Sequence, residues 1–464
     1  MPVTLVGDAE LVPCIDGVDR PYLGLDTAAS TPAHPDVAAR VQAFLPWYSS
    51  VHRGAGYKSQ RATAAYEEAR VSAMRFAGRA DTSGHDDVAI IVRNTTEAIN
   101  HLAYRLRLEP GDTVVTTVAE HHANLLPWAR LGADREWVEC GRDGTFTTEA
   151  VIEALDRVAR HGRPARLLAI TGATNVTGWQ PPLDLIIEAA HEREVPVLID
   201  AAQVAAHAPM PAAADYLAWS GHKMYAPFGA GVLLGPRSTF ATGDPFLAGG
   251  GAVDLVDLDE VVWTDPPERE EAGSPNVIGA VALGAAIEML EGIGWPAIAE
   301  HEQEVSRRLR EGLAGVDGVT LLGPGLDVPT LAVASFIVAD VPHALVAARL
   351  SAEFGIGVRH GCFCAHPYLI RLLGLPAEEI ERYRADVLAG DRRSIPGAVR
   401  ASAGLSGTVA DVDRLVAAVG VIASGAAPPV PYTQDASTGD FWPDGKAAPW
   451  ADAFRHVGAS CSRG

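Results

Sequence analysis

Residues Ala218 to Gly231 read AWSGHKMYAPFGAG. This stretch places one lysine, Lys223, on a tight Ser-Gly-His turn. An apolar segment (216–219) precedes the turn, and a glycine-flanked strand (231–235) follows it. Lysine side chains are normally kept at the solvated surface. A lysine between two buried strands needs a chemical reason, and a Schiff base with a carbonyl cofactor is a common one. A lysine in a surface loop is the alternative.

A second stretch, residues 195–203 with the sequence VPVLIDAAQ, has the pattern of a buried strand ending in a carboxylate, Asp200. Ligands of open α/β sheets bind at the carboxyl ends of the strands. Pyridoxal phosphate needs a lysine amine for its aldehyde and an acid for its ring nitrogen. Lys223 and Asp200 fit those roles on consecutive strands, although an isolated Asp at a strand end is more often a turn or cap residue.

The composition excludes several classes of protein. The chain has 464 residues, enough for two domains, and a formal net charge of −21. Such an acidic chain is not expected to bind nucleic acid or an anionic membrane, and no apolar run is long enough for a transmembrane helix. Five cysteines do not form a disulfide framework. The first residues lack the features of a signal peptide, so we expect a cytoplasmic protein.

Strand and helix patterns alternate along the first half of the chain, which is typical of a doubly wound α/β sheet. A strand over 87–93 leads into Asn94-Thr95-Thr96, where a helix begins. Hydroxyls and free N–H groups at a helix start form an anion site, so Thr95 and Thr96 are candidate phosphate ligands. Simple capping by Asn94 or Thr95 explains the same residues equally well.

The segment SGHKMYAP (220–227), preceded by Asp-Ala-Ala-Gln (200–203), resembles the class V aminotransferase superfamily of fold-type I enzymes. Within it, the chain is most similar to the SufS-like cysteine desulfurases and selenocysteine lyases, over roughly residues 20 to 425. The resemblance implies pyridoxal phosphate as cofactor. It also implies a large domain with a mainly parallel seven-stranded sheet and a smaller α+β C-terminal domain. We expect an N-terminal segment (1–40) packed on the small domain, the large domain (41–285), the small domain (286–425) and an extended tail (426–464).

The same resemblance assigns roles to single residues, and it favours phosphate binding by Thr95 and Thr96. The adjacent pair His121 and His122 is not expected to bind metal, because neighbours do not share a helix face and no third ligand is apparent. The remaining roles implied by the resemblance are ring stacking by His121, contact with the cofactor hydroxyl and substrate carboxylate by Asn175, a hydrogen bond to the phenolic oxygen by Gln203, phosphate binding by Ser220 and His222, phosphate binding across a dimer interface by Ser274, and a place near the substrate for Ala28.

The loop over residues 355–367, GIGVRHGCFCAHP, decides the reaction. Two cysteines one residue apart are a weak zinc signal, and buried inert thiols are the general alternative. Arg359 and nearby histidines favour a thiolate. SufS-like loops read Arg-x-Gly-x-x-Cys-Ala-x-Pro, which places the reactive thiol at Cys364 and makes Cys362 an extra. The choice between the two thiols stays open. Arg359 is expected to contact the substrate.

Arg400 resembles the family arginine that binds the substrate carboxylate, a role that suits its planar fork; a surface arginine is the alternative. The chain is longer than SufS-like proteins around 374–396 and beyond 425. The resemblance implies a homodimeric cysteine desulfurase that acts on a small amino acid and passes sulfur to an acceptor protein. An aminotransferase, epimerase or C–S lyase that does not use Cys364, and a non-catalytic binding protein, are the alternatives.

Overall fold

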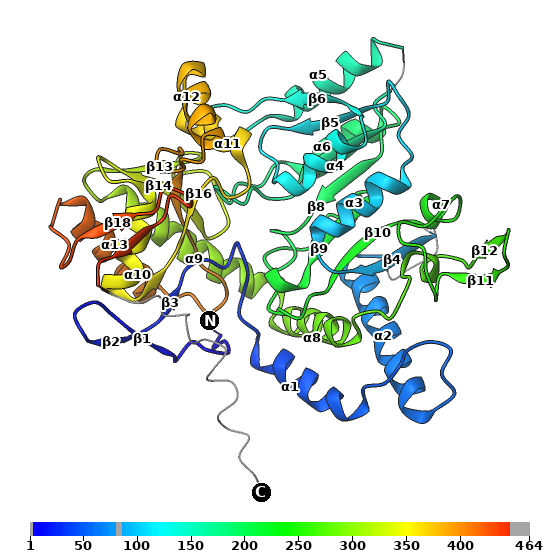
Figure 1. The fold of residues 1–464 in the computed structure, drawn as a ribbon. Helices are drawn as coiled ribbons and strands as arrows, with labels where there is room; N and C mark the ends of the chain where they lie inside the picture. The colour runs from blue at the N-terminus through cyan, green and yellow to red at the C-terminus, as the bar shows by residue number, and fades with distance from the viewer. Residues whose placement is uncertain (1–2, 80–85, 163, 446–464) are drawn as a thin grey trace, which may run out of the picture.

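The computed structural model describes residues 3–79, 86–162 and 164–445. Two domains lie side by side, and the N-terminal segment runs beneath both (Figure 1). Separate clusters of buried apolar residues form their cores. The expected α/β class and two-domain architecture are therefore confirmed, whereas the domain boundaries at 40, 285 and 425 stay predictions.

The large domain is built on a seven-stranded sheet, as predicted. Its one antiparallel strand is the glycine-flanked strand that follows Lys223, and all other neighbouring pairs are parallel. The strands in spatial order are β4 (Asp87–Val92), β10 (Gly231–Pro236), β9 (Tyr216–Ser220), β8 (Val197–Asp200), β7 (Leu167–Thr171), β5 (Thr113–Thr117) and β6 (Asp134–Val138). Because β5, β7, β8 and β9 run in one direction, their carboxyl ends share one edge of the sheet.

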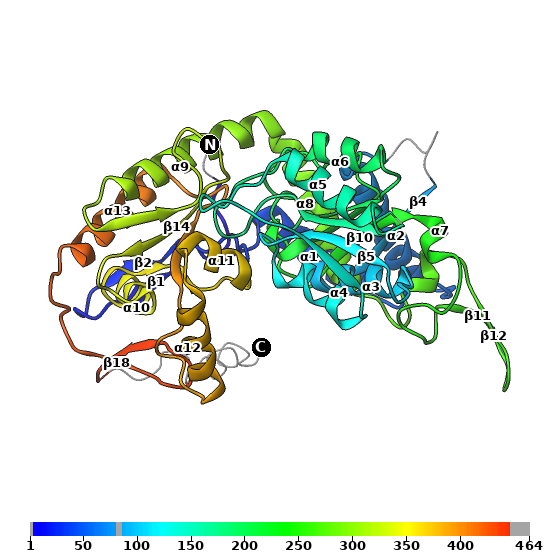
Figure 2. The same ribbon diagram turned by 90° about the horizontal axis from the view of Figure 1, so that it is seen from above.

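Helices cover both faces of this sheet (Figure 2). Near-continuous apolar strands such as Leu167–Thr171 need this cover, because parallel sheets are buried on both faces. One face packs against α3 (Thr95–Arg105), α4 (Leu126–Arg130) and α7 (Arg237–Phe240). The other packs against α2 (Tyr57–Phe76), α5 (Thr148–Ala159), α6 (Leu183–His191) and α8 (Val277–Ile293), and α1 (Pro35–Phe44) lies on α8.

The small domain has a four-stranded antiparallel sheet. Its order is β13 (Val319–Leu322), β14 (Val333–Val338), β17 (Ala398–Ser402) and β16 (Arg359–Gly361), and it packs with α9 (Trp295–Ala314), α10 (His343–Phe354) and α13 (Val409–Ala423). The N-terminal segment adds the hairpin β1 (Leu11–Pro13) and β2 (Asp19–Pro21), and β3 (Leu23–Gly24) pairs with β15 (Ile356–Gly357). Leu23 and Leu25 are buried in the small-domain core, so this segment is tied to that domain.

The extra length around 374–396 forms α12 (Ala377–Leu388), which follows α11 (His366–Leu373) and projects from the small domain (Figure 2). The described part of the tail forms a hairpin of β18 (Tyr432–Gln434) and β19 (Phe441–Pro443). The hairpin joins the inserted segment through Arg392 N–H, which donates to Ala436 O at 2.8 Å. Tyr432 donates to Glu353 at 3.2 Å. The tail thus packs on the body, and its part beyond residue 445 lies outside the described residues.

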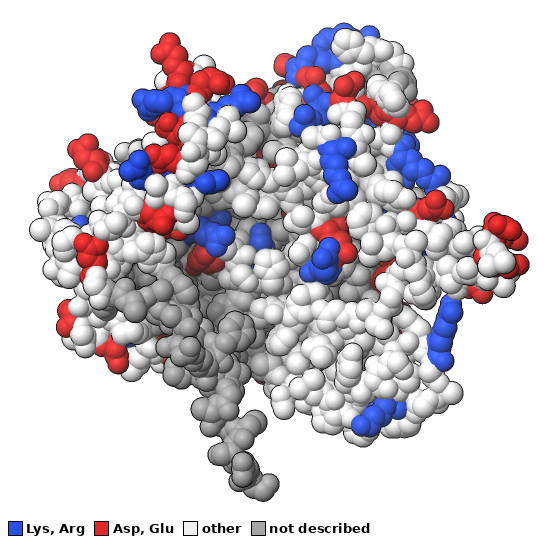
Figure 3. Space-filling model, in the orientation of Figure 1, with Lys and Arg blue, Asp and Glu red and all other residues white. Residues whose placement is uncertain are grey.

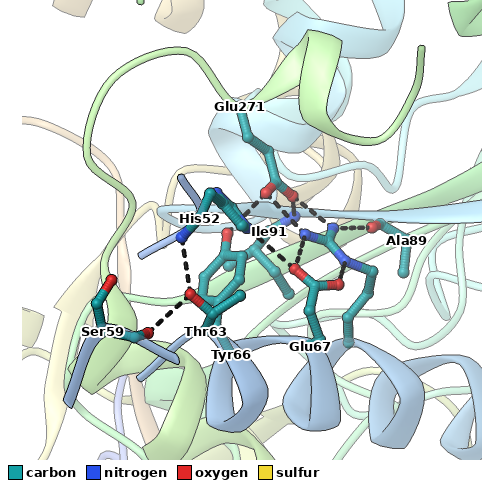
Figure 4. Close-up of polar contacts among 9 residues, drawn as sticks. His52, Ser59, Thr63, Tyr66, Glu67, Ala89, Ile91 and Glu271 are labelled. Carbon is teal, nitrogen blue, oxygen red and sulfur yellow. Dashed lines mark hydrogen bonds and ion pairs between the residues drawn. The ribbon is translucent and has the colours of Figure 1, made fainter. Parts of the chain in front are cut away.

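A buried polar network ties the segment before α8 to the large domain (Figure 4). Glu271 receives hydrogen bonds from Arg70 at 2.7 and 2.9 Å, from Tyr66 at 2.8 Å and from the Ile91 N–H at 2.6 Å. Arg70 also donates to the Ala89 carbonyl at 2.6 Å. Both charges of the pair are buried, and the surrounding bonds satisfy them, as a buried ion pair requires.

The remaining elements are short or lie at the edges. They are η1 (Leu45–Trp47), η2 (His122–Asn124), η3 (Gly221–Lys223), η4 (Glu268–Glu270), β11 (Val253–Val256) and β12 (Val261–Trp263). Among the described residues, no single helix is long and apolar enough to cross a membrane; α8 and α9 meet that length and composition only as a pair, across an 82° bend.

Candidate functional site

A cavity of about 230 Å³ opens at the carboxyl edge of the large sheet. Charged side chains of both signs lie in the hollow between the two domains (Figure 3). All predicted site residues except Ser274 line this cavity, namely Ala28, Thr95, Thr96, His121, Asn175, Asp200, Gln203, Ser220, His222, Lys223, Arg359, Cys364 and Arg400. Residues from Ala28 to Arg400 therefore meet at one place, and the small domain contributes the last three of them.

Lys223 ends the short helix η3 directly after β9. The turn is compact because glycines let backbones approach: a Cβ on Gly231 would lie 2.6 Å from the Trp219 carbonyl oxygen and 2.8 Å from Asn94 Cα. Lys223 is half-buried, since its side chain faces the cavity. Burial lowers the pKa of Lys223 to about 8, although the nearby Asp200 acts in the opposite direction. About a tenth of the amine is therefore neutral and nucleophilic at pH 7.

Asp200 ends β8 and is almost fully buried. Its Oδ1 accepts a hydrogen bond from the Ala202 N–H at 3.0 Å. Burial raises the pKa of Asp200, while this hydrogen bond and Lys223 favour the charged form. Gln203, three residues on, is held by a 2.8 Å hydrogen bond from its amide to the Ala28 carbonyl. Asp200 and Lys223 line the same cavity.

The start of α3 carries the candidate phosphate site. Asn94 is the N-cap and accepts from the Glu97 N–H at 3.0 Å, as the capping interpretation expected. Thr95 is buried and bonds Ser220 Oγ through both its N–H (2.8 Å) and its hydroxyl (2.7 Å). Thr96 is exposed at the cavity wall. Hydroxyls at a helix N-terminus suit an anion, so capping and phosphate binding are compatible here.

His121 follows β5 and lies in the cavity wall. Burial, reinforced by the positive charge of Lys223, lowers the pKa of His121 to about 3, so its ring is neutral near neutral pH. The preceding residue, Glu120, fixes the position of this loop through three hydrogen bonds. It accepts from Thr117 at 2.8 Å, from the Thr171 N–H at 3.0 Å and from Asn124 at 2.7 Å. Burial raises the pKa of Glu120 to about 8.

Arg400 is the buried cation of the small-domain wall. Its Nη1 donates to the Asn175 carbonyl and its Nη2 to Asp26 Oδ1, both at 2.9 Å. Arg359 lies 3.4 Å from the other oxygen of Asp26. The Phe363 ring lies 5.1 Å from the Arg400 guanidinium carbon. These contacts hold the guanidinium group of Arg400 at the cavity wall, where it can bind a carboxylate.

Cys364 lies on a strained turn. The Ala365 N–H donates to the Cys362 carbonyl at 2.9 Å, and the two central residues, Phe363 and Cys364, have φ of +54° and +55°. A left-handed backbone conformation is unfavourable for residues other than glycine, so contacts with the surrounding structure must stabilise it. The Asn175 amide donates to the Phe363 carbonyl at 2.7 Å, and the His122 N–H donates to the Cys364 carbonyl at 2.7 Å.

The turn presents its two thiols differently. Cys364 is exposed and lines the cavity, whereas Cys362 is partly buried and does not line it. His122 also stacks on His366, with ring centroids 5.0 Å apart, and these two rings flank the turn. The described residues contain no group of three or more His, Cys, Asp or Glu side chains that could hold a metal ion.

Sequence reasoning missed Asp26, which contacts both arginines of the cavity. Sequence analysis assigned a role only to Ala28 in this segment, and the carboxylate two residues before it was the available signal. It also missed Glu120 and Phe363, whose roles depend on contacts between distant segments. Ser274 is exposed and lies outside the lining of this cavity. Its predicted role on a second copy stays a prediction.

The donor set fits pyridoxal phosphate. The buried acid Asp200 and the amine of Lys223 face one cavity, and paired hydroxyls lie at a helix N-terminus beside them. A neutral ring at His121 can pack on an aromatic face without adding charge. Arg400 leaves its buried Nε without a hydrogen-bond partner among the described residues, a donor that a bound anion can satisfy.

The chain is similar to known proteins over most of its length. The family model described as aminotransferase class V matches residues 23–415. A cysteine desulfurase of Klebsiella pneumoniae (strain 342) is 34% identical over 411 residues, which cover 86% of this chain and 92% of the relative. The apo structure of a cysteine desulfurase from Thermococcus onnurineus NA1 has a TM-score of 0.75 at 30% identity and covers 87% of this chain and 95% of its own. The Escherichia coli cysteine desulfurase CsdA has a TM-score of 0.70 at 31% identity, covering 86% and 94%.

Proposed function

Because the chain belongs to the aminotransferase class V family, we propose that it is a pyridoxal-phosphate-dependent cysteine desulfurase. It converts L-cysteine to L-alanine and transfers the sulfur to Cys364 as a persulfide. One observation carries this proposal: an exposed thiol on a strained turn faces the same cavity as Lys223, Asp200 and Arg400. An aminotransferase that makes no use of sulfur has no need for that thiol.

Members of this family depend on pyridoxal phosphate. When bound, the cofactor supplies an aldehyde that combines with amines and a ring that accepts electrons from the substrate Cα. Lys223 would hold the aldehyde, Asp200 would keep a proton on the ring nitrogen, and His121 would pack on the ring. Thr95, Thr96, Ser220 and His222 would bind the phosphate.

The remaining groups orient the substrate. Arg400 binds the cysteine carboxylate, and its guanidinium is already held by the Asn175 carbonyl and by Asp26. The Lys223 amine, with a pKa of about 8, accepts the Cα proton and returns a proton to the product. The ring of His121 stays neutral, so it carries no positive charge that would pair with the Asp200 carboxylate.

Cys364 receives the sulfur. Its thiolate attacks the sulfur of the substrate, so that an S–S bond forms on the enzyme while the substrate Cβ–S bond breaks. The bonding electrons of the broken bond stay with the substrate carbon, which takes up a proton and leaves as alanine. Arg359 and Arg400 line the same cavity as this thiol.

The test compares Cys364→Ala with its neighbour, Cys362→Ala. We expect Cys364→Ala to keep the cofactor absorbance but to lose persulfide and alanine formation from L-cysteine by more than about a hundredfold. Cys362→Ala should keep both, because Cys362 does not line the cavity. Loss in Cys362→Ala alone would move the role to that thiol. Undiminished alanine formation in Cys364→Ala would refute the sulfur step and favour a C–S lyase or aminotransferase.

We also propose that the active form is a cytoplasmic homodimer in which Ser274 reaches the phosphate site of the second copy, and that an acceptor protein takes the persulfide sulfur. Support for the dimer comes from the resemblance of the Ala272–Asn276 segment. Sedimentation of the holoenzyme tests the oligomeric state. Cofactor affinity of Ser274→Ala tests the contribution of its hydroxyl.

A further inference from the structure

The tail hairpin contacts the strand that precedes the cysteine turn. Asp440 lies in the link between β18 and β19, directly before β19 begins. Its Oδ1 lies 3.3 Å from Nε2 of His360, the central residue of β16. Both β19 and β16 also pack against α10. The family model ends at residue 415, so a segment outside the family match contacts an element of the proposed active site.

The position of Asp440 is fixed by the tail and by the inserted segment beside it (Figure 2). The Asp440 N–H donates to Thr438 Oγ1 at 3.2 Å, and the Asp440 carbonyl accepts from the Asp435 N–H at 2.9 Å. The preceding residue, Gly439, has a φ of +82°. A Cβ on Gly439 would lie 2.6 Å from the Arg392 carbonyl oxygen, so the hairpin fits against the inserted segment only with glycine there.

The strand that Asp440 contacts has few other restraints. β16 has three residues and lies at the edge of the small-domain sheet, where it pairs with β17 alone. Its first residue, Arg359, lines the cavity, and the turn that carries Cys364 begins directly after the strand. Successive side chains of a strand point to opposite faces, so Asp440 contacts the face of β16 opposite to Arg359. A shift of this edge strand would move the arginine and the start of the turn together.

The surroundings of His360 favour a neutral ring with its proton directed at Asp440. Burial lowers the pKa of His360, although Asp440 acts in the opposite direction, so the ring is neutral near neutral pH. A carboxylate only accepts hydrogen bonds, so the ring proton lies on Nε2. The ring of His343 packs beside it, with centroids 5.4 Å apart, and His343 Nε2 lies 3.1 Å from the Ile395 carbonyl oxygen of the inserted segment.

Building on the proposed function, we propose that Asp440 is a positioning residue of the active site and acts through His360. It holds β16 in place, and with it Arg359 and the start of the turn that carries Cys364. The large domain already holds the far part of this turn, at the carbonyls of Phe363 and Cys364. The tail hairpin therefore supplies the second support of the thiol. Such support matters because a displacement of about 1 Å can lower a rate by about a hundredfold.

The test measures kcat and KM of the holoenzyme for alanine formation from L-cysteine, per bound cofactor. We expect Asp440→Ala to lower kcat at least about threefold, because the thiol attacks from a displaced turn. KM should stay within about twofold, since Arg400 binds the carboxylate from β17 and keeps its own contacts. Asp440→Asn retains an oxygen that accepts from His360 and should restore kcat. Asp444→Ala is the matched control, because it removes an exposed carboxylate of the same hairpin that contacts Thr433 at 2.7 Å, and it should leave kcat unchanged.

A double-mutant cycle shows whether the effect passes through His360. His360→Phe keeps a ring beside His343 but removes Nε2, so adding Asp440→Ala to it should lower kcat no further. Three results would overturn the proposal: an unchanged kcat in Asp440→Ala, an equal loss in Asp444→Ala, or losses that multiply in the double variant.

Hydrogen exchange of the holoenzyme gives a readout that does not need the reaction. Peptides that cover β16 and the turn should exchange about two- to fivefold faster in Asp440→Ala and at the wild-type rate in Asp444→Ala, since a partly exposed pair contributes at most about that much. Unchanged exchange in Asp440→Ala would overturn the proposal even where L-cysteine yields persulfide. Faster exchange in a protein that forms no persulfide would support the role of Asp440 in holding β16 and refute the proposed activity.

Discussion

Glu271→Gln should strongly destabilise the contact between α2, β4 and the segment before α8. The substitution keeps the shape of the side chain but removes the charge that faces Arg70 at 2.7 Å. The side chains of this pair are 9% and 3% exposed, so little water replaces the lost charge. Breaking a buried pair by removing one partner costs about 3–5 kcal/mol. Because Arg70 keeps a 3.0 Å contact with the half-exposed Glu67, we expect the lower end, about 3 kcal/mol.

The chain offers a control with the same chemistry and the same distance. Glu288 and Arg40 are also 2.7 Å apart, but their side chains are 43% and 51% exposed. Exposed pairs contribute about 0–1 kcal/mol, so Glu288→Gln should be nearly neutral. The substitution and the N···O distance are matched, whereas burial and the added hydrogen bonds from Tyr66 and the Ile91 N–H are found only at Glu271.

Native-state hydrogen exchange of the cofactor-free protein measures the difference. The amides of α2 and β4, including the Ile91 N–H that donates to Glu271, report the local opening free energy. A loss of about 3 kcal/mol corresponds to a fall in protection of more than about a hundredfold. For Glu288→Gln the fall should stay below about fivefold. Equal losses of protection in the two variants would refute the reasoning that burial decides the strength of these pairs.

Two further predictions concern titration. Asp200→Asn removes the charge that raises the pKa of Lys223, so we expect the pKa to fall below its value of about 8; the pH dependence of reductive methylation of Lys223 in cofactor-free protein measures it, and a higher pKa would contradict the assignment. The pKa of His121 is about 3 in the folded protein against an ordinary 6.5. Between these values the unfolded chain binds a proton that the folded chain does not, so this histidine costs stability as pH falls below 6.5, by about 1.4 kcal/mol per pH unit. His121→Phe should therefore lose less stability than the wild-type protein between pH 6.5 and 5 in urea unfolding of cofactor-free protein; equal losses would show that His121 titrates normally.

The fold class and most of the cavity could be predicted from the sequence. Asp200 ends one short apolar strand and Lys223 follows the end of the next, and strands of a parallel sheet place such ends at one edge. The start of α3 could also be predicted, because Asn94 is its N-cap and the hydroxyl residues Thr95 and Thr96 follow directly. These features are local: the backbone period and the capping chemistry of a few residues determine them.

Tertiary structure decided the contacts that join distant segments. Asp26 and Arg400 are 374 positions apart, and no local pattern connects them. The different exposure of Cys362 and Cys364 depends on a turn held from outside by Asn175 and His122, against the backbone preference of its own residues. Pairing, burial and strain of this kind depend on which segments meet in space. Local sequence features therefore indicated the cofactor chemistry. Only the packing of the two domains decided that Cys364 rather than Cys362 lines the cavity and that Asp26 contacts Arg400.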